Sequence, residues 1–203
     1  MNGSNTHEEW CDFLNLSALT FGVTTRALDR GKIYFSEYMD KSTPTEHNQT
    51  HIAIRKHGDS RMYIYAKWPS LQLPDLMSSN GVVEKALGRQ WVVNVFSFWE
   101  DVYRPKFASE SGLSVKEVIN PIMGDLRLIR NDIVHHSSIS SKPNSGRCTV
   151  LKEWVQVGEE IEINEFKILD FMMHWGLVQI GPESVEQAGL FKGDGSSATD
   201  SDS

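Results

Sequence analysis

The stretch that decides the fold is Val82 to Lys106, VVEKALGRQWVVNVFSFWEDVYRPK, near the middle of the chain. Its apolar residues recur at helical spacing in two adjacent rows, Trp91, Val95, Phe98 and Val102 and then Val92, Phe96, Trp99 and Tyr103. Two such rows make a helix apolar over a wide arc, so this one is expected to lie at the centre of a helix bundle. Pro105 is expected to bend or end it, because proline lacks the N–H that an α-helix uses.

An amphipathic helix is predicted on the N-terminal side of this central helix. Apolar residues recur at spacings of three, four and seven from Trp10 to Leu28, after two acids that suit a helix start. Gly31 is expected to end this helix, and a second short helical piece is expected over residues 33–38. Residues 42–48 have the composition of a loop.

Two helices are predicted on the C-terminal side. Ser114 and Glu117 form a capping-box pattern at the start of a helix over about residues 114–136, which Pro121 interrupts. Asn164 is expected to cap the last helix. The apolar side chains that recur along this last helix are Phe166, Leu169 and Met173.

The hydrophobic period changes to two between residues 51 and 68, which predicts a β-hairpin with its turn at Gly58-Asp59. The expected cross-strand pairs are Ile54 with Tyr63 and Ile52 with Tyr65. The hairpin is expected to be a small appendage packed on the helices. The fold class is therefore mainly α, a helical bundle with a small β-hairpin.

Length and composition set the domain organisation. The 203 residues are 39% hydrophobic and 10% aromatic, which suits one folded domain over residues 8–188. Residues 1–7 are expected to be a flexible N-terminus and residues 189–203 a disordered tail. No apolar run is long enough for a membrane span or a signal peptide, so a cytoplasmic location without membrane contact is expected. Cys11 and Cys148 are too few for a disulfide framework.

The charge of the chain excludes a protein that coats nucleic acid by bulk electrostatics. The net charge is −7, from 20 Lys and Arg against 27 Asp and Glu. Most of the excess acid lies in residues 159–170 and 192–203, whereas residues 102–136 carry one more basic than acidic residue. That stretch would not repel a phosphate.

Most common catalytic motifs are absent from the sequence. It contains no HExxH or CxxC pattern, no Gly-rich phosphate loop and no GxSxG, so neither a metal nor a cofactor is expected. What remains is Gly124 to His136, GDLRLIRNDIVHH. A guanidinium can stabilise a phosphate, and an imidazole can move protons near neutral pH. Those are the parts of a metal-independent ribonuclease.

A helical wheel separates the structural residues of this segment from its polar ones. The predicted core face consists of Ile122, Leu126, Ile129 and Ile133. Measured from Ile122, Arg130 lies at about 80° and His135 at about 220° on the wheel. The residues between these two positions are Arg127, Asn131 and Val134.

The pattern Arg130-Asn131-xxx-His135 resembles the motif of HEPN domains. The surrounding Pro121 to His136 resembles the motif-bearing helix of HEPN proteins from plasmids and prophages, and Phe98 to Pro105 resembles the helix before it. The resemblance implies a HEPN-like bundle that dimerises and cleaves RNA at a site between the two motif helices. His135 would then be the general base or acid, Arg130 the phosphorane stabiliser and Asn131 an orienting partner.

The same resemblance implies an RNA substrate, a homodimer and a toxin or phage-defence role, with a cognate antitoxin or regulatory protein as a further partner. Weaker candidates for substrate binding are Arg127, Arg104, Glu100 and His136. Glu100 and Arg104 are more often a surface ion pair at this spacing. Two alternatives stay open: a non-catalytic HEPN-like module that binds RNA or protein, and a purely structural adaptor.

Overall fold

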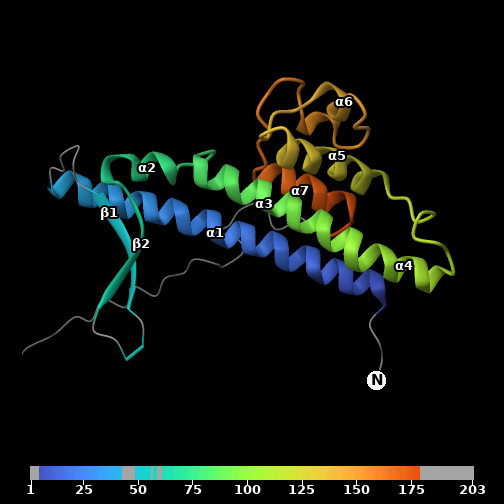
Figure 1. Cartoon of the computed structure of the whole chain (residues 1–203), viewed down its shortest axis with the longest axis horizontal. Coiled ribbons are helices and arrows are strands. Elements are labelled where there is room, and N and C mark those ends of the chain that lie inside the picture. Colours follow the sequence, from blue (N-terminus) through green and yellow to red (C-terminus); the bar gives the residue numbers. More distant parts are fainter. Residues whose placement is uncertain (1–4, 43–48, 56, 59–60, 179–203) are drawn as a thin grey trace, which may run out of the picture.

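The computed structural model of the chain describes residues 5–42, 49–55, 57–58 and 61–178, and it is mainly helical (Figure 1). The expected tail over residues 189–203 lies outside the described residues. None of the helices in the described residues combines the length and the apolarity that a membrane crossing requires.

Helix α1 (Thr6–Ser42) is one continuous helix, so the predicted break at Gly31 is wrong. Gly31 costs only about 1 kcal/mol of helix propensity, and helical neighbours on both sides offset it. A Cβ at this position would lie 3.2 Å from Met77 Sδ, which shows how closely the next segment approaches. The helix begins at Thr6, whose N–H and hydroxyl both donate to Glu110, so residues 6 and 7 of the stretch expected to be flexible are helical, and residues 1–4 lie outside the described residues.

The central helix is longer than predicted and changes its pitch. Helix α3 (Val82–Phe98) passes into the π-helical turn η2 (Trp99–Tyr103), and α4 (Arg104–Ser111) follows in the same direction. Pro105 occupies the first turn of α4, where the missing N–H matters least, so it does not end the helix. The helix ends only at Gly112, which adopts the left-handed conformation with φ 65°.

Helix α5 (Pro121–His135) carries the motif and starts seven residues later than predicted. Ser114 N–H and Oγ do donate to Glu117, at 2.8 and 2.7 Å, but this contact closes only a turn. These hydrogen bonds hold the pKa of Glu117 below its usual range. The N-cap is Asn120, whose side chain accepts from the N–H of Met123. A proline at the first helical position explains why the helix begins there.

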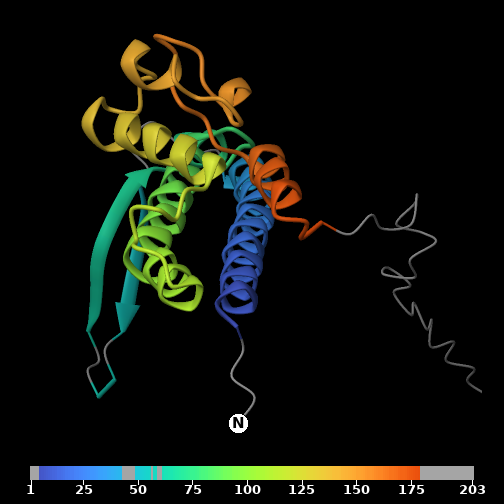
Figure 2. The ribbon, with the colours of Figure 1, turned by 90° about the vertical axis from the view of Figure 1, so that its right-hand side faces the viewer.

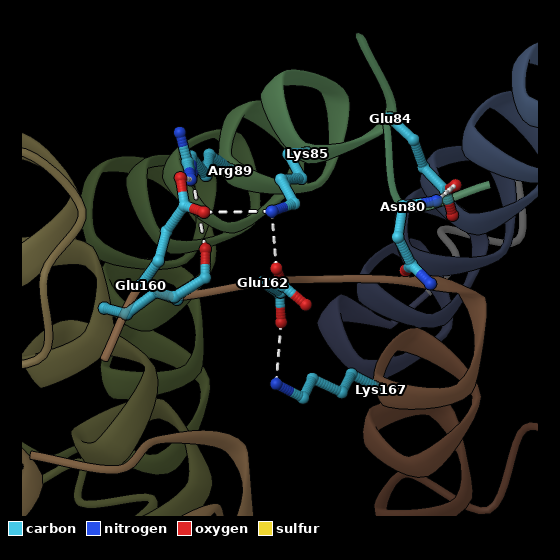
Figure 3. A network of polar contacts seen from close by, with 8 residues as sticks. Asn80, Glu84, Lys85, Arg89, Glu160, Glu162 and Lys167 are labelled. Carbon is cyan, nitrogen blue, oxygen red and sulfur yellow. Dashed lines mark hydrogen bonds and ion pairs between the residues drawn. The ribbon is translucent and has the colours of Figure 1, made fainter. Parts of the chain in front are cut away.

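A cap of short elements follows α5 and lies with it on one side of α3, at the top of Figures 1 and 2. It includes α6 (Lys142–Ser145) and the 3-10 turn η3 (Lys152–Trp154), and it leads into α7 (Glu165–His174). Figure 3 shows how its last strand-like segment is tied to α3: Lys85 Nζ lies 2.9 Å from Glu160 and 2.5 Å from Glu162. Lys167 completes the tie by donating to the carbonyls of Trp154 and Glu162.

Helix α7 is capped by Asn164 as predicted, but it buries a different face. Its buried side chains are Ile168, Phe171 and Met172. The three residues predicted to line the helix, Phe166, Leu169 and Met173, are exposed to 79%, 46% and 60%. The helix packs antiparallel to α1, with Glu165 accepting from Thr25 at one end and Trp175 against Trp10 at the other.

One hydrophobic core joins α1, α3, α5, α7 and the cap. Its largest fully buried side chains include Trp10, Leu14, Val92, Leu126, Ile129 and Phe171. The predicted core face of α5 is confirmed for Ile122, Leu126 and Ile129, while Ile133 packs against the core only partly buried. The opposite side of α5, which carries Arg127 and His135, lies outside this core.

The β-hairpin exists, with strands β1 (Gln49–Arg55) and β2 (Met62–Pro69), and Ile54 pairs with Tyr63 as predicted. Ile52 pairs with Ala66 instead of Tyr65, because a bulge shifts the register between Ile52 and Ala53. The hairpin extends away from the helices instead of packing on them (Figure 1). Its exposed apolar side chains are Ile52, Ile54, Met62, Tyr63, Ile64 and Trp68. After β2 the chain returns through the turn η1 (Ser70–Gln72) and the short helix α2 (Leu73–Leu76).

Candidate functional site

The outer face of α5, which we define as Arg127, Asn131, Val134 and His135, points away from the core. Arg127, Val134 and His135 are exposed and Asn131 is half-buried. Arg130 lies at one edge of this face and is also half-buried. Arg130 and His135 are therefore on the solvent side of the helix, as the wheel predicted, but about 140° apart around its axis.

Arg130 has an incompletely satisfied guanidinium. One of its terminal nitrogens, Nη1, donates to Asn131 Oδ1 at 3.3 Å. Its Nε is buried and has no hydrogen-bond acceptor among the described residues. Buried donors in native structures nearly always have a partner, so the lack of one among the described residues marks the Arg130 side chain as incompletely satisfied. Asn131 orients the guanidinium from the adjacent position on the helix.

His135 is the last residue of α5 and lies exposed. It forms no hydrogen bond and no ion pair with any described residue, so nothing in the described part of the chain fixes its ring. Its neighbour His136 has Nε2 3.9 Å from Asp132 Oδ1. Both imidazoles lie where the C-terminal dipole of the helix favours positive charge, which is a purely structural use for them.

Three of the weaker candidates come together at one cavity of about 180 Å³, which we call the π-turn cavity. Glu100 and Arg104 line it from the side of η2 and α4, and Arg127 lines it from α5. Arg104 Nη1 lies 2.9 and 3.0 Å from the two carboxylate oxygens of Glu100, and its Nε donates to the carbonyl of Val118 at 3.1 Å. Arg127 has neither a hydrogen bond nor an ion pair with a described residue. The predicted surface pair thus exists, and it forms one wall of a cavity.

The sequence interpretation missed two buried carboxylates on α5. Asp125 is 4% exposed and its Oδ2 accepts from the backbone N–H groups of Thr149, Val150 and Leu151, at 2.8, 2.6 and 2.9 Å. Asp132 is 1% exposed and accepts from Ser141 and Asn144. Two acids seven residues apart beside the core face, followed by a Ser- and Asn-rich segment, were the available signal.

These carboxylates fasten the cap to α5 directly beside the motif. Ser137 and Ser138 follow the helix with φ 53° and 64°, a left-handed conformation that costs about 1 kcal/mol or more per residue outside glycine. Ser138 N–H donates to the carbonyl of Asp132, which holds the reversal in place. The end of α5 is thus held in place by the cap.

Burial and the nearby Asp125 and Asp132 carboxylates raise the pKa of the Cys148 thiol to about 11.

A larger groove of about 420 Å³ lies between α1 and α7, away from the motif. Its lining is mostly apolar and includes Phe21, Phe166 and Leu169. Its charged groups are Arg26 and Glu165, 3.8 Å apart. Its lining residues include no imidazole, and its carboxylate, Glu165, accepts from Thr25 and lies near Arg26, so we place the candidate chemistry at α5.

No group of three or more His, Cys, Asp or Glu side chains in the described part of the chain is arranged to hold a metal ion. The expectation that no metal or cofactor takes part stays a prediction. Neither a family model nor a curated protein nor a solved structure matches this chain. The function must therefore be argued from the residues themselves.

Proposed function

We propose that this protein is a metal-independent endoribonuclease of HEPN type that acts as a homodimer. The observation that supports the proposal is that α5 carries two guanidiniums without a carboxylate partner among the described residues, Arg127 on its outer face and Arg130 at the edge of that face, and an exposed imidazole at its C-terminal end. Acidic residues outnumber Lys and Arg by seven in this chain. Arg127 and Arg130 have none within ion-pair distance among the described residues, so both can bind a phosphate.

The chemistry needs a base for the ribose 2′-hydroxyl and an acid for the leaving 5′-oxygen. The 2′-oxygen attacks the adjacent phosphorus, its proton passes to one imidazole, and the 5′-oxygen leaves with a proton from a second. Each chain supplies one His135, so a two-fold dimer supplies both groups. Arg130 would stabilise the charge on the phosphorane, and its separation of about 140° from His135 is explained if the two act across the dimer axis.

The position of Val134 supports a dimer through this face. Its side chain is 47% exposed between polar neighbours, where a helix face in contact with water gains nothing from an apolar residue. Val134→Asp should split the dimer and abolish cleavage together, whereas Val157→Asp, at a somewhat more exposed valine in the cap, should do neither. Sedimentation velocity measures the first effect, and a wild-type monomer at micromolar concentration contradicts the proposal.

The reaction products provide the decisive experiment. Purified protein is incubated with tRNA or mRNA in EDTA, and the ends of the fragments are analysed. We expect a 2′,3′-cyclic phosphate and a 5′-hydroxyl, no cleavage of DNA, and no effect of EDTA. A 5′-phosphate, or activity that requires added Mg²⁺ or Mn²⁺, would overturn the mechanism.

The catalytic role of His135 is tested by His135→Ala with His174→Ala as the matched control. Both histidines are exposed at the end of a helix, but His174 lies on α7, outside the outer face of α5. We expect the first variant to lose cleavage while its circular dichroism and Tm are unchanged, and the second to remain active. A folded His135→Ala protein that cuts at the wild-type rate removes His135 from the mechanism.

A second candidate is an RNA-binding module that does not cleave. The observation in its favour is that His135 has no described partner to orient its ring, whereas Arg130 is oriented by Asn131. RNA binding that needs Arg127 and Arg130 but yields no fragments would select this function. The toxin or defence role and a cognate antitoxin stay predictions from the family resemblance.

A further inference from the structure

The π-turn cavity has the features of a binding site and not of a packing defect. Phe96 and Trp99 give it an aromatic wall, Glu100 and Arg104 a polar one, and Arg127 lies at its α5 side. These residues come from segments about 20 positions apart in the sequence. Figure 1 shows α5 crossing beside the junction of α3 and α4, where the cavity lies.

We propose that the π-turn cavity binds a single nucleotide unit, with its base inside and its phosphate on Arg127. The base would lie against the aromatic wall, and its hydrogen-bonding edge would face Glu100 and Arg104. Calling this unit a part of an RNA substrate rests on the proposed function. The binding itself does not, because it can be measured with free nucleotides.

Gly124 is the first observation that favours a ligand in this space. It lies in the first half of α5, where glycine costs about 0.5–1 kcal/mol relative to alanine. No close packing requires it, because a Cβ at this position would meet nothing within 4 Å. Its φ is not positive either. Gly124 lines the π-turn cavity, and the absence of a side chain at this position leaves the cavity open.

The π-helical turn is the second observation. A π turn is less stable than a continued α-helix and occurs often at functional sites. Here η2 contains Trp99 and Glu100, and Arg104 follows it directly. The distortion therefore lies at the residues that form the wall of the cavity.

The charges assign the two ends of the ligand. Arg104 is held by Glu100 and by the carbonyl of Val118, so its guanidinium is fixed and neutralised. A carboxylate has about four acceptor positions, and the ion pair uses only some of them. Glu100 can therefore still accept from the amino group of a base. Arg127 is the cation without a described partner, which makes it the group for the phosphate.

The position of Arg127 connects the cavity to the motif. It precedes Asn131 by four residues, one turn of α5. A phosphate bound by Arg127 is therefore a neighbour of the phosphate that Arg130 would contact. The base in the cavity would then belong to a nucleotide next to the cleaved bond, and it would contribute sequence preference.

The test uses the full chain and five probes: AMP, GMP, CMP, UMP and inorganic phosphate. Binding is followed by isothermal titration or by chemical shifts of the tryptophan side chains. We expect the amino-bearing nucleotides AMP, GMP and CMP to bind more tightly than UMP, and inorganic phosphate to bind at least about tenfold more weakly than the best nucleotide. Equal binding of phosphate and nucleotides would overturn the proposal, because it indicates an anion patch without a base pocket.

Two substitutions at Gly124 separate binding from stability. Gly124→Leu should fill the cavity and abolish nucleotide binding. Gly124→Ala should raise the Tm by roughly 1–4 °C, since alanine favours the helix, and yet weaken nucleotide binding. A stabilised variant that binds less cannot be explained by misfolding. Unchanged affinity in both variants refutes the pocket.

Arg127→Ala tests the phosphate contact, with Arg30→Ala as its control. Both arginines are exposed and have no described ion pair, but Arg30 lies on α1. We expect Arg127→Ala to bind nucleotides about tenfold more weakly than the wild type and Arg30→Ala to bind them with unchanged affinity. Equal effects of the two substitutions indicate nonspecific attraction and contradict the assignment. Nucleotide binding without RNA cleavage leaves the pocket intact and removes the proposed enzyme, so the two failures are distinguishable.

Discussion

Gly88 is the position where the packing of the fold can be tested most sharply. It lies buried in α3 against the segment that leads into α7. A Cβ built on Gly88 would lie 2.8 Å from the Cβ of Ile163, 2.9 Å from its carbonyl carbon and closer still to its carbonyl oxygen. The obstacle is backbone, which cannot rotate away as a long side chain can. Gly88→Ala must therefore push the segment and α3 apart.

The size of the effect follows from two opposing terms. Overpacking a close-packed site costs typically 1–3 kcal/mol, and more where the backbone has to move. The segment resists movement because Glu160 and Glu162 are tied to Lys85 and Arg89 of α3 (Figure 3). Helix propensity returns about 1 kcal/mol, because alanine replaces glycine in a helix. We expect a net loss of about 2 kcal/mol in the free energy of unfolding.

The assay is thermal unfolding followed by circular dichroism, with Gly124→Ala as the matched control. A loss of about 2 kcal/mol lowers the Tm of a chain of this length by roughly 4–8 °C. The control makes the same substitution in a helix where a Cβ meets nothing, and it should raise the Tm. If Gly88→Ala is as stable as the wild type, the close contact of α3 with residue 163 is wrong.

Three further predictions concern buried and charged groups. Asp125→Ala removes the acceptor of three backbone N–H groups, of which that of Leu151 is buried, and should cost roughly 3 kcal/mol in urea unfolding, whereas exposed Asp101→Ala should change stability by less than about 0.5 kcal/mol. Lys85 and Arg89 hold the pKa of Glu160 below its usual range. The ionised Glu160 carboxylate therefore stabilises the folded state above about pH 4.3, and this stabilisation is lost as the pH falls further. The fall of the Tm toward pH 3 should be shallower in Glu160→Gln than in the wild type. With its pKa raised to about 11, the buried Cys148 is a thiol at pH 8, so iodoacetamide should label it at pH 8 only after unfolding. Peptide mass analysis separates this label from that of the half-buried Cys11, and labelling of Cys148 itself in the native protein would show that the cap opens.

The buried acids of α5 connect stability to the proposed chemistry. Asp132 lies between Arg130 and His135 in the sequence but points to the other side, where it fastens the cap. Loss of this anchor would release the left-handed turn at Ser137 and Ser138 and with it the end of α5. A substitution at Asp132 is therefore expected to reduce activity through the position of His135, and a reduced Tm distinguishes this from a direct catalytic role.

The sequence by itself determined the features that depend on local interactions. Helical periodicity identified the core face of α5, Ile122, Leu126 and Ile129, because apolar spacing reports which side of a helix can be buried. The role of Asn164 as the N-cap residue of α7 and the Ile54–Tyr63 pair of the hairpin were also predictable, since each involves residues close in the sequence. The polar outer face of α5 follows from the same periodicity.

Only the tertiary structure decided which surfaces are covered and which distant residues meet. Periodicity could not tell that α7 buries Ile168 and Phe171 instead of Phe166, because both of its sides are apolar and α1 selects one. Nor could it place Glu100, Arg104 and Arg127 at one cavity, which depends on how α5 crosses the π turn. The burial of Asp125 could not be predicted either, because the three N–H groups that donate to it come from residues 149–151. In each case the deciding contact comes from a segment far away in the sequence, and its free energy is not encoded in the local pattern.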